Sequence, residues 1–435
     1  MRMRDRVLLI LPAVLATMFL VDCHNYSCGG FGDLPCTSAS TGNGSGGFGG
    51  GGGGGGSTAG VFAYAVDQTN VKMDGYELNT SANTFSAISG YTAPAIPDSE
   101  PGLGMVIAQK QFVYAAFDVG GGAIYGWSVN SSTGALTPLT PVTLALDLPG
   151  VGAFNQYSLA TNPAGTLLFV SDTGLNEILV FQIGTTGALT LVGSPIATPF
   201  EPGNLTTDGL GLYLYATQSL GTNTHQGGTQ LLAYSIGTGS NLGVLTAVTG
   251  SPFTLPVPMW QVQGDPSGNY LIGTSGNNLD FTGSDDLHLY VFSIQPTTGT
   301  APGAVAQVTN SPFSTTYSPF NIAVQPTSSG GEFVYSFSIN DTDTGYNSIE
   351  GFQLNATSGA LTKITGSPFG GTGLGHWGQF DQSGAFLFVY SSSLVSGVTA
   401  TQLAVWDAGT GGVLTQPISP VTLVAPGYWA VTDPQ

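Results

Sequence analysis

Side chains that could bind a neutral molecule recur where repeated segments of this sequence begin. The polar members are Ser158, Asn204, Gln261 and Asn321, and the aromatic members beside them are Trp260, Trp377 and Trp429. Amides offer hydrogen-bond donors and acceptors, and indoles offer flat faces for sugars or aromatic rings. The pattern therefore predicts a ligand site, and the alternative is that these residues hold waters or neighbouring parts of the fold.

Acid–base chemistry has one well-placed candidate, His376, which lies beside one of these segment starts. No serine or cysteine stands at a spacing that would mark a partner for it. His225 and His288 lie in or beside long loops. A hydrolytic triad therefore cannot be drawn from the sequence. The competing interpretation of His376 is a structural histidine at a strand start.

A short stretch rich in side-chain oxygens contains Asp341, Asp343 and Asn347, and Glu350 follows three residues later. Alternating oxygen ligands around a glycine turn suit a hard cation. The spacing departs from that of an EF-hand, whose glycine comes one residue later. Calcium bound by these four residues is the one cofactor that the sequence suggests, and an ordinary Asx-rich turn is the alternative.

The charge of the chain limits its partners. The net charge is −19, and only 7% of residues are charged, against about 25% in a typical domain. After Arg6 the only basic side chains besides histidine are Lys72, Lys110 and Lys363. This balance argues against nucleic acid and anionic surfaces. It also removes the arginine that a phosphorylated or carboxylated substrate would prefer, so we expect a neutral small molecule, a glycan or a protein as partner.

A repeated unit must position these residues. The segment Thr-Ser-Gly-Ala-Leu-Thr, followed by Gly-Ser-Pro-Phe, occupies residues 357–369 and recurs in similar forms. Its first glycine recurs as Gly134, Gly187, Gly243, Gly303, Gly359 and Gly412. The spacings, taken as differences between these numbers, are 53, 56, 60, 56 and 53 residues. A period this regular indicates one supersecondary unit repeated along the chain.

Each unit contains four short strands joined by turns, and no segment shows a helical period of useful length. Six units are complete: Met105–Leu139, Ser158–Ile196, Asn204–Phe253, Gln261–Phe313, Asn321–Phe369 and Trp377–Val421. Residues 61–89 hold only three strands, and we expect Tyr428–Thr432 to supply the missing inner one. The predicted fold is all-β: a seven-bladed β-propeller of four-stranded antiparallel blades, closed by the C-terminal strand joining the N-terminal blade.

The chain resembles the bacterial lactonase family of seven-bladed propellers in three features. These are strands of the Phe-Val-Tyr type, the turn Asp265-Pro266-Ser267-Gly268, and the repeated motif Thr-Ser-Gly-Ala-Leu-Thr with Gly-Ser-Pro-Phe. That family is related to 6-phosphogluconolactonase and to muconate-lactonizing propellers, and the resemblance covers Val61–Gln435. It implies enzymes that bind acidic substrates through arginine and use histidine or a carboxylate as general acid or base. This chain has neither histidine nor arginine at the matching strand starts.

The N-terminal 60 residues have a different character. Residues 1–22 combine three arginines with an apolar run and predict a signal peptide. Leu20-Val21-Asp22-Cys23 resembles a bacterial lipoprotein box, although Asp22 is unusual there, so lipidation of Cys23 and ordinary cleavage nearby both stay open. Residues 23–60 predict a Gly/Ser-rich tether, and residues 61–435 the propeller. We therefore expect an extracytoplasmic protein, in the cell envelope or secreted, that meets a membrane only through a lipid anchor.

Three functions are compatible with these features. The first is a binding or interaction module that uses the loop-rich face and the mouth of the central channel. The second is a lactonase-like hydrolase acting on a neutral lactone or sugar lactone, and the third is a structural surface protein. The long loops after the second strands, Ser219–Gly228, Ser275–Asp286, Asn340–Asn347 and Ser391–Thr399, should project on the same face as the strand starts.

Overall fold

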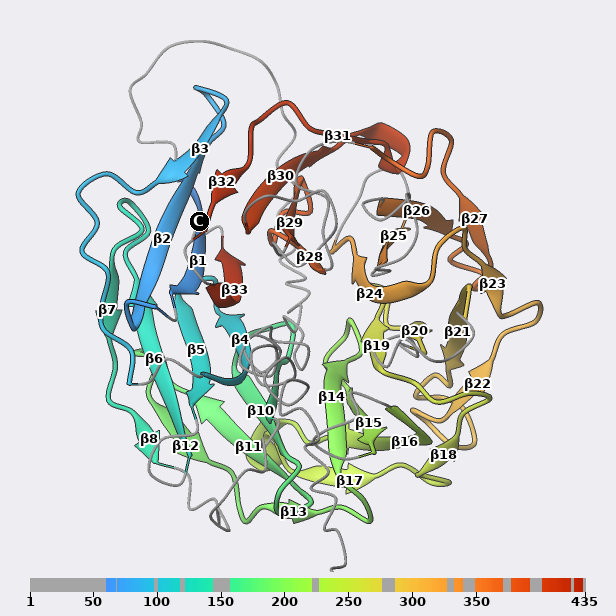
Figure 1. Ribbon diagram of the computed structural model, residues 1–435. Coiled ribbons are helices and arrows are strands. Elements are labelled where there is room, and N and C mark those ends of the chain that lie inside the picture. The colour runs from blue at the N-terminus through green and yellow to red at the C-terminus, as the bar shows by residue number, and fades with distance from the viewer. Residues whose placement is uncertain are drawn as a thin grey trace, which may run out of the picture.

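The computed structural model contains seven small antiparallel sheets arranged in a ring (Figure 1). It describes residues 60–67, 69–97, 101–117, 122–143, 157–220, 227–275, 286–326, 332–338, 349–370, 377–391, 401–423 and 426–432. The described part holds strands and two short 3-10 helices, η1 (Gly239–Asn241) and η2 (Thr410–Gly412). None of its helices is long and apolar enough to cross a membrane. The seven-bladed all-β propeller is confirmed.

The first three complete blades follow one plan, in which the strands run outwards in chain order. Blade 1 comprises β4 (Pro101–Ala108), β5 (Phe112–Phe117), β6 (Ala123–Val129), β7 (Leu136–Pro138) and β8 (Val142–Thr143). Blade 2 comprises β9 (Tyr157–Thr161), β10 (Leu167–Asp172), β11 (Glu177–Ile183), β12 (Leu189–Leu191) and β13 (Ile196–Ala197). Blade 3 comprises β14 (Pro202–Thr207), β15 (Tyr213–Ser219), β16 (Gly227–Ile236), β17 (Leu245–Ala247) and β18 (Phe253–Thr254).

The next three blades repeat it. Blade 4 comprises β19 (Gln261–Gly264), β20 (Tyr270–Thr274), β21 (His288–Ile294), β22 (Val305–Gln307) and β23 (Phe313–Ser314). Blade 5 comprises β24 (Pro319–Val324), β25 (Glu332–Ser338), β26 (Ile349–Leu354) and β27 (Leu361–Lys363). Blade 6 comprises β28 (Trp377–Phe380), β29 (Phe386–Ser391), β30 (Gln402–Ala408), β31 (Leu414–Thr415) and β32 (Val421–Thr422).

Blade 7 joins the two ends of the propeller. Its strands are β1 (Val61–Asp67), β2 (Lys72–Asn79), β3 (Thr84–Ala87) and β33 (Pro426–Thr432). The sheet order is β3-β2-β1-β33, so the C-terminal strand is innermost (Figure 1, red beside blue). Tyr64 lies opposite Ala430 in this antiparallel pairing. The predicted closure of the ring is therefore confirmed.

The repeated motif has two structural roles. Its Gly-Ala-Leu-Thr part turns into the fourth strand, and its Gly-Ser-Pro-Phe part forms a short fifth strand that also pairs with the third. In blades 3, 4 and 5 the serine hydroxyl of the second part accepts a hydrogen bond from a third-strand N–H; the donors are Ala233, Val291 and Gly351. Four strands per blade were predicted, and blades 1, 2, 3, 4 and 6 have five.

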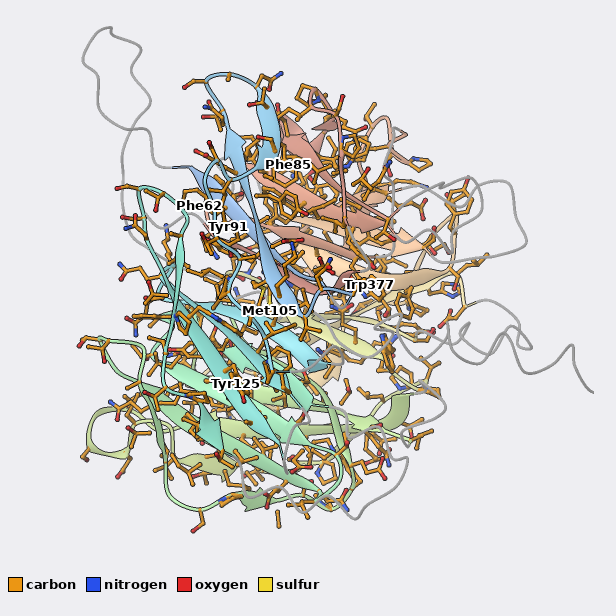
Figure 2. All side chains as sticks on the ribbon, turned by 60° about the vertical axis from the view of Figure 1, so that its left-hand side comes forward. Phe62, Phe85, Tyr91, Met105, Tyr125 and Trp377 are labelled. Carbon is orange, nitrogen blue, oxygen red and sulfur yellow. The ribbon has the colours of Figure 1, made fainter. Side chains whose placement is uncertain are left out.

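Neighbouring blades pack face to face through the alternating side chains of their strands. Between blades 7 and 1, Phe62 and Met105 are 0% and 1% exposed and belong to one cluster of buried residues (Figure 2). Between blades 7 and 6, the rings of Phe85 and Phe388 meet edge to face, with centroids 5.6 Å apart. The interior is therefore a ring of interfaces between blades, which holds each inner strand at a defined height.

Candidate functional site

The inner strands bring most of the predicted ring residues to one level around the axis of the propeller. In each blade the residue opposite the end of the second strand occupies the ring position: Gln261 pairs with Thr274, and Trp377 pairs with Tyr390. Ser158 pairs with Ser171 at the same level. These residues, together with Asn204 and Asn321, form what we call the axial ring. The equivalent residue of blade 1 is Gly104, which adds no side chain.

The pairing of blade 7 differs from the sequence-based alignment by one residue. Tyr64 is equivalent to Tyr114, because the hydroxyl of each donates a hydrogen bond to the carbonyl of the first glycine of the repeated motif in the next blade. Trp429 lies opposite Ala65, which is equivalent to Val389 of blade 6, so Trp429 matches Gly378 rather than Trp377. A ligand role for Trp429 stays a prediction.

The polar members of the axial ring bind the next blade. In each case a side-chain oxygen accepts a hydrogen bond from a backbone N–H of the following inner strand. The pairs are Ser158 with Leu205 (3.1 Å), Asn204 with Val262 (3.0 Å), Gln261 with Ile322 (3.0 Å) and Asn321 with Gly378 (3.5 Å). One oxygen of each side chain is therefore committed to holding neighbouring blades, as the alternative interpretation of these residues supposes.

Two side-chain amide atoms on adjacent inner strands make no such hydrogen bond within the described residues. The Nδ2 of Asn321 and the Oε1 of Gln379 are buried, and neither has a hydrogen-bond partner in the described part of the protein. The two residues are 1% and 3% exposed. A buried amide group without a partner is costly, so such a group is usually satisfied by water or by a ligand.

Aromatic rings form an arc over blades 4, 5 and 6. The rings of Trp260 and Phe320 are stacked, with centroids 6.1 Å apart and an interplanar angle of 23°. Phe320 meets Trp377 edge to face at 5.8 Å, and Trp377 lies 5.4 Å from Tyr390. Figure 2 labels Trp377 on β28. We call Trp260, Phe320 and Trp377 the aromatic arc.

Phe320 and Gln379 were not predicted to belong to the site, although the sequence carries a signal for both. Trp260 and Phe320 each come directly before a ring residue, so the same slot is aromatic in two consecutive repeats. Gln379 lies two residues after Trp377, on the same face of the same strand. Position within the repeat, rather than residue type alone, would have found them.

The lysines of the propeller are engaged elsewhere. Lys72 Nζ lies 2.8 Å from an Asp74 oxygen and 3.7 Å from an Asp67 oxygen. Lys363 forms an ion pair with Glu350. Lys110 has an interaction of its own and is likewise not free. An anionic substrate would therefore have to compete for each of these cations.

Glu350, the one described member of the predicted calcium site, has protein partners on both oxygens. Its Oε2 accepts hydrogen bonds from the N–H groups of Thr316 (2.8 Å) and Tyr317 (3.4 Å), and its Oε1 binds Lys363. Its side chain is 2% exposed. A calcium ion would have to displace these partners. Asp341, Asp343 and Asn347 lie outside the described residues, and no metal-binding group of three occurs within them.

His376 and Cys23 also lie outside the described residues, so the general acid/base and lipidation predictions stay predictions. The same holds for the signal peptide and for most of the tether.

The opposite end of the inner strands carries a group of carboxyls that the sequence analysis did not single out. Asp208 and Asp265 follow β14 and β19 and are 1% and 0% exposed. Burial raises the pKa of Asp208 to about 6 despite three backbone N–H bonds, with a smaller contribution from Asp265. Burial and the neighbouring Asp265 carboxylate raise the pKa of Glu332 as well. Asp265 interacts electrostatically with Asp208 in the turn of blade 3 and with Glu332 at the start of β25 in blade 5.

No family model matches the chain, and no curated protein matches it. Solved structures of similar fold include a candidate 6-phosphogluconolactonase of Bacteroides uniformis, 16% identical with a TM-score of 0.61, covering 86% of this chain and 100% of the other. The periplasmic gluconolactonase of Pseudomonas aeruginosa is 13% identical with a TM-score of 0.61, covering 86% and 99%.

A candidate 6-phosphogluconolactonase of Bacteroides fragilis is 15% identical with a TM-score of 0.59, covering 87% and 99%. At these identities the likeness concerns the fold alone. The chain is a seven-bladed propeller with lactonase-like structural neighbours, and the resemblance noted in the sequence is confirmed at that level.

Proposed function

We propose that this propeller binds a neutral cyclic ligand that bears hydroxyl and carbonyl groups, such as a sugar or a sugar lactone, at the axial ring. The observation that carries the proposal is the pair of buried amide atoms, Asn321 Nδ2 and Gln379 Oε1, for which the described residues provide no hydrogen-bond partner. The first atom is a donor and the second an acceptor, and the carbonyl and hydroxyl groups of a sugar or a sugar lactone include partners for both.

The aromatic arc supports the same ligand class. The C–H faces of a sugar ring pack well against indole rings, and Trp260 and Trp377 retain 9% and 7% exposure at this level. Charge points the same way, because the chain has no arginine after Arg6 and its propeller lysines have partners. Recognition through amides and aromatic faces, without a cation, favours an uncharged ligand.

A binding titration tests this proposal. Purified full-length protein is titrated with neutral sugars, with neutral lactones and with phosphorylated sugars, and binding is followed by calorimetry and tryptophan fluorescence. We expect saturable binding of a neutral member and none of its phosphorylated form. Absence of binding by every neutral member, in folded protein, would contradict the proposal.

Gln379→Leu is the diagnostic variant. It keeps much of the side-chain volume and removes the carbonyl that has no partner, so we expect unchanged or increased thermal stability and affinity reduced by about 5- to 30-fold. Gln353→Leu is the control, because Gln353 is exposed on β26. An equal loss of affinity in both variants would contradict binding at the axial ring.

Hydrolysis of a neutral lactone is the second candidate, favoured by the names of the structural neighbours, which include a gluconolactonase. The same panel tests it when acid release is recorded alongside binding. Ring opening of a lactone that binds would make the protein an enzyme, whereas binding without acid release leaves it a binding module.

The proposal also places the protein outside the cytoplasm on a flexible tether. It is supported by the apolar run near the N-terminus and by the glycine-rich stretch before β1. The mass of the mature N-terminal peptide from membrane and medium fractions tests it. A mature chain beginning at Cys23 with added acyl mass supports an anchor, and an uncleaved Met1 would contradict export through a signal peptide.

A further inference from the structure

A histidine and an aspartate form a close pair at the start of the third strand of blade 4. His288 Nδ1 lies 2.7 Å from Asp286 Oδ1, and the two side chains are 39% and 15% exposed. The Tyr290 hydroxyl donates to the other carboxylate oxygen at 3.0 Å. When the imidazole is neutral, the carboxylate favours the tautomer with its proton on Nδ1, and Nε2 then has the lone pair that can act as a base.

The surroundings hold this pair in place. Burial, together with the Asp286 carboxylate, raises the pKa of Tyr290, so its hydroxyl stays a donor. Thr315 N–H donates to the Leu287 carbonyl at 2.8 Å, and β21 continues from His288 as a regular strand. Asp286 and Tyr290 are the charged or titratable groups in contact with His288 among the described residues.

A serine stands directly across the sheet from this histidine. In the antiparallel pairing of β21 with β23, Ser314 is the partner of His288. Directly opposite residues project on the same face, with Cβ atoms about 4.5–5.5 Å apart. Ser314 is exposed. A hydroxyl, an imidazole and a carboxylate therefore follow one another in the order used for nucleophilic catalysis.

Other blades show what the same cross-strand position does without a base. In blade 3 it is filled by Gln230 and Thr254, and the Gln230 amide donates to the Thr254 hydroxyl at 3.5 Å. Blade 6 has Gln402 opposite Thr422. Side chains in this position thus reach each other, and a glutamine–hydroxyl pair is the structural version. Blade 4 replaces the glutamine by a histidine with a carboxylate behind it.

We propose that Asp286, His288 and Ser314 form an acyl-transfer site that hydrolyses neutral open-chain carboxylic esters. His288 Nε2 takes the hydroxyl proton as Ser314 Oγ bonds to the acyl carbon. The bond from that carbon to the alcohol oxygen breaks, and the alcohol takes the proton from His288. Water then attacks the acyl-serine with the same proton transfers, which releases the acid and restores the serine. This site lies on the third strand, and the inference does not depend on binding at the axial ring.

The test is covalent labelling of the full-length protein with a fluorophosphonate, a probe for activated serines. We expect one adduct, mapped by mass spectrometry to Ser314 and absent from Ser314→Ala. His288→Gln recreates the pair found in blades 3 and 6 and should slow labelling by about 100-fold or more. Thr254→Ala is the matched control and should label at the wild-type rate. Hydrolysis of p-nitrophenyl acetate should follow the same order.

Folding of each variant is checked by thermal unfolding, and the labelling result then decides. An adduct confined to other residues, or equal labelling rates for wild type and His288→Gln, would overturn the proposal. Acetate release by Ser314→Ala at the wild-type rate would do the same. Loss of sugar binding in Gln379→Leu with labelling intact would show that the two sites are separate.

Discussion

At Gly187 the backbone φ is +81°, and an added Cβ would lie 2.6 Å from carbon atoms of Phe112 and Leu139. The carbonyl of this glycine also accepts a hydrogen bond from Tyr114 of the preceding blade. The same arrangement recurs around the ring in four pairs: Tyr64–Gly134, Tyr114–Gly187, Tyr215–Gly303 and Tyr335–Gly412. The first glycine of the repeated motif thus makes a contact between blades and also forms a turn.

Gly187→Ala should destabilise the protein by at least about 2 kcal/mol, because the left-handed conformation is strained and the methyl group overlaps a packed ring. Gly193→Ala is the control, since Gly193 has a φ of +67° with nothing within 4 Å of an added Cβ. It should cost about 1 kcal/mol from conformation alone. Chemical denaturation measures both, and equal losses would show that the contact with Phe112 adds nothing.

Glu350 gives a second prediction at the residue scale. Glu350→Gln leaves Lys363 without its counter-charge and weakens the bonds from Thr316 and Tyr317, so stability should fall by roughly 1–3 kcal/mol. Because the carboxylate already has these partners, saturating calcium should not change the melting temperature of the wild type. A clear rise with calcium, lost in Glu350→Gln, would instead support the predicted calcium site.

At the scale of elements, the turn after β14 and the start of β25 carry carboxyl groups whose ionised form is destabilised by burial. The pKa of Asp208 is raised to about 6, and that of Glu332 is raised as well. An ordinary carboxyl in the unfolded chain ionises near pH 4. The folded state therefore binds more protons than the unfolded state between these values, and stability falls as pH rises through that range.

The free energy of unfolding should thus be larger at about pH 5 than at about pH 8. Glu332→Gln should reduce this dependence, because it removes one raised pKa and relieves Asp265 of a neighbouring negative charge. Denaturation at several pH values measures the slope, and Glu77→Gln, a substitution on β2 of blade 7, serves as the control. A steeper slope in Glu332→Gln than in wild type would contradict the assignment.

At the scale of the whole molecule, stability depends on closure. The β33 strand pairs with β1 and contacts β4 of blade 1 and β28 of blade 6. Without it, the edge of β1 would be exposed, and exposed strand edges promote association between chains.

Deletion of residues 426–435 should therefore yield aggregated protein with no cooperative unfolding transition. Light scattering and thermal unfolding measure the effect. Deletion of residues 433–435 alone leaves β33 in place and should have little effect. A monomeric, cooperatively folded product of the longer deletion would show that the ring does not need its inner N-terminal-blade strand.

Local patterns in the sequence were enough to predict the repeat, the number of blades and the way the ring closes. These follow from three local patterns: the alternation of residues in strands, the glycines in turns, and an N-terminal segment with three strands where a blade needs four. Phase within the repeat also located Ser158, Asn204, Gln261 and Asn321 at one level.

The contacts of those residues could not be predicted from such local patterns. Asn204 binds Val262, 58 residues away, and such a partner depends on how adjacent blades pack. Likewise Ser314 meets His288 through strand pairing across a long connection, so no sequence spacing marks the pair. A repeat consists of patterns among neighbouring residues, so it can be recognised in the sequence. Contacts between side chains on different strands depend on strand register and blade packing, which exist only in the folded chain.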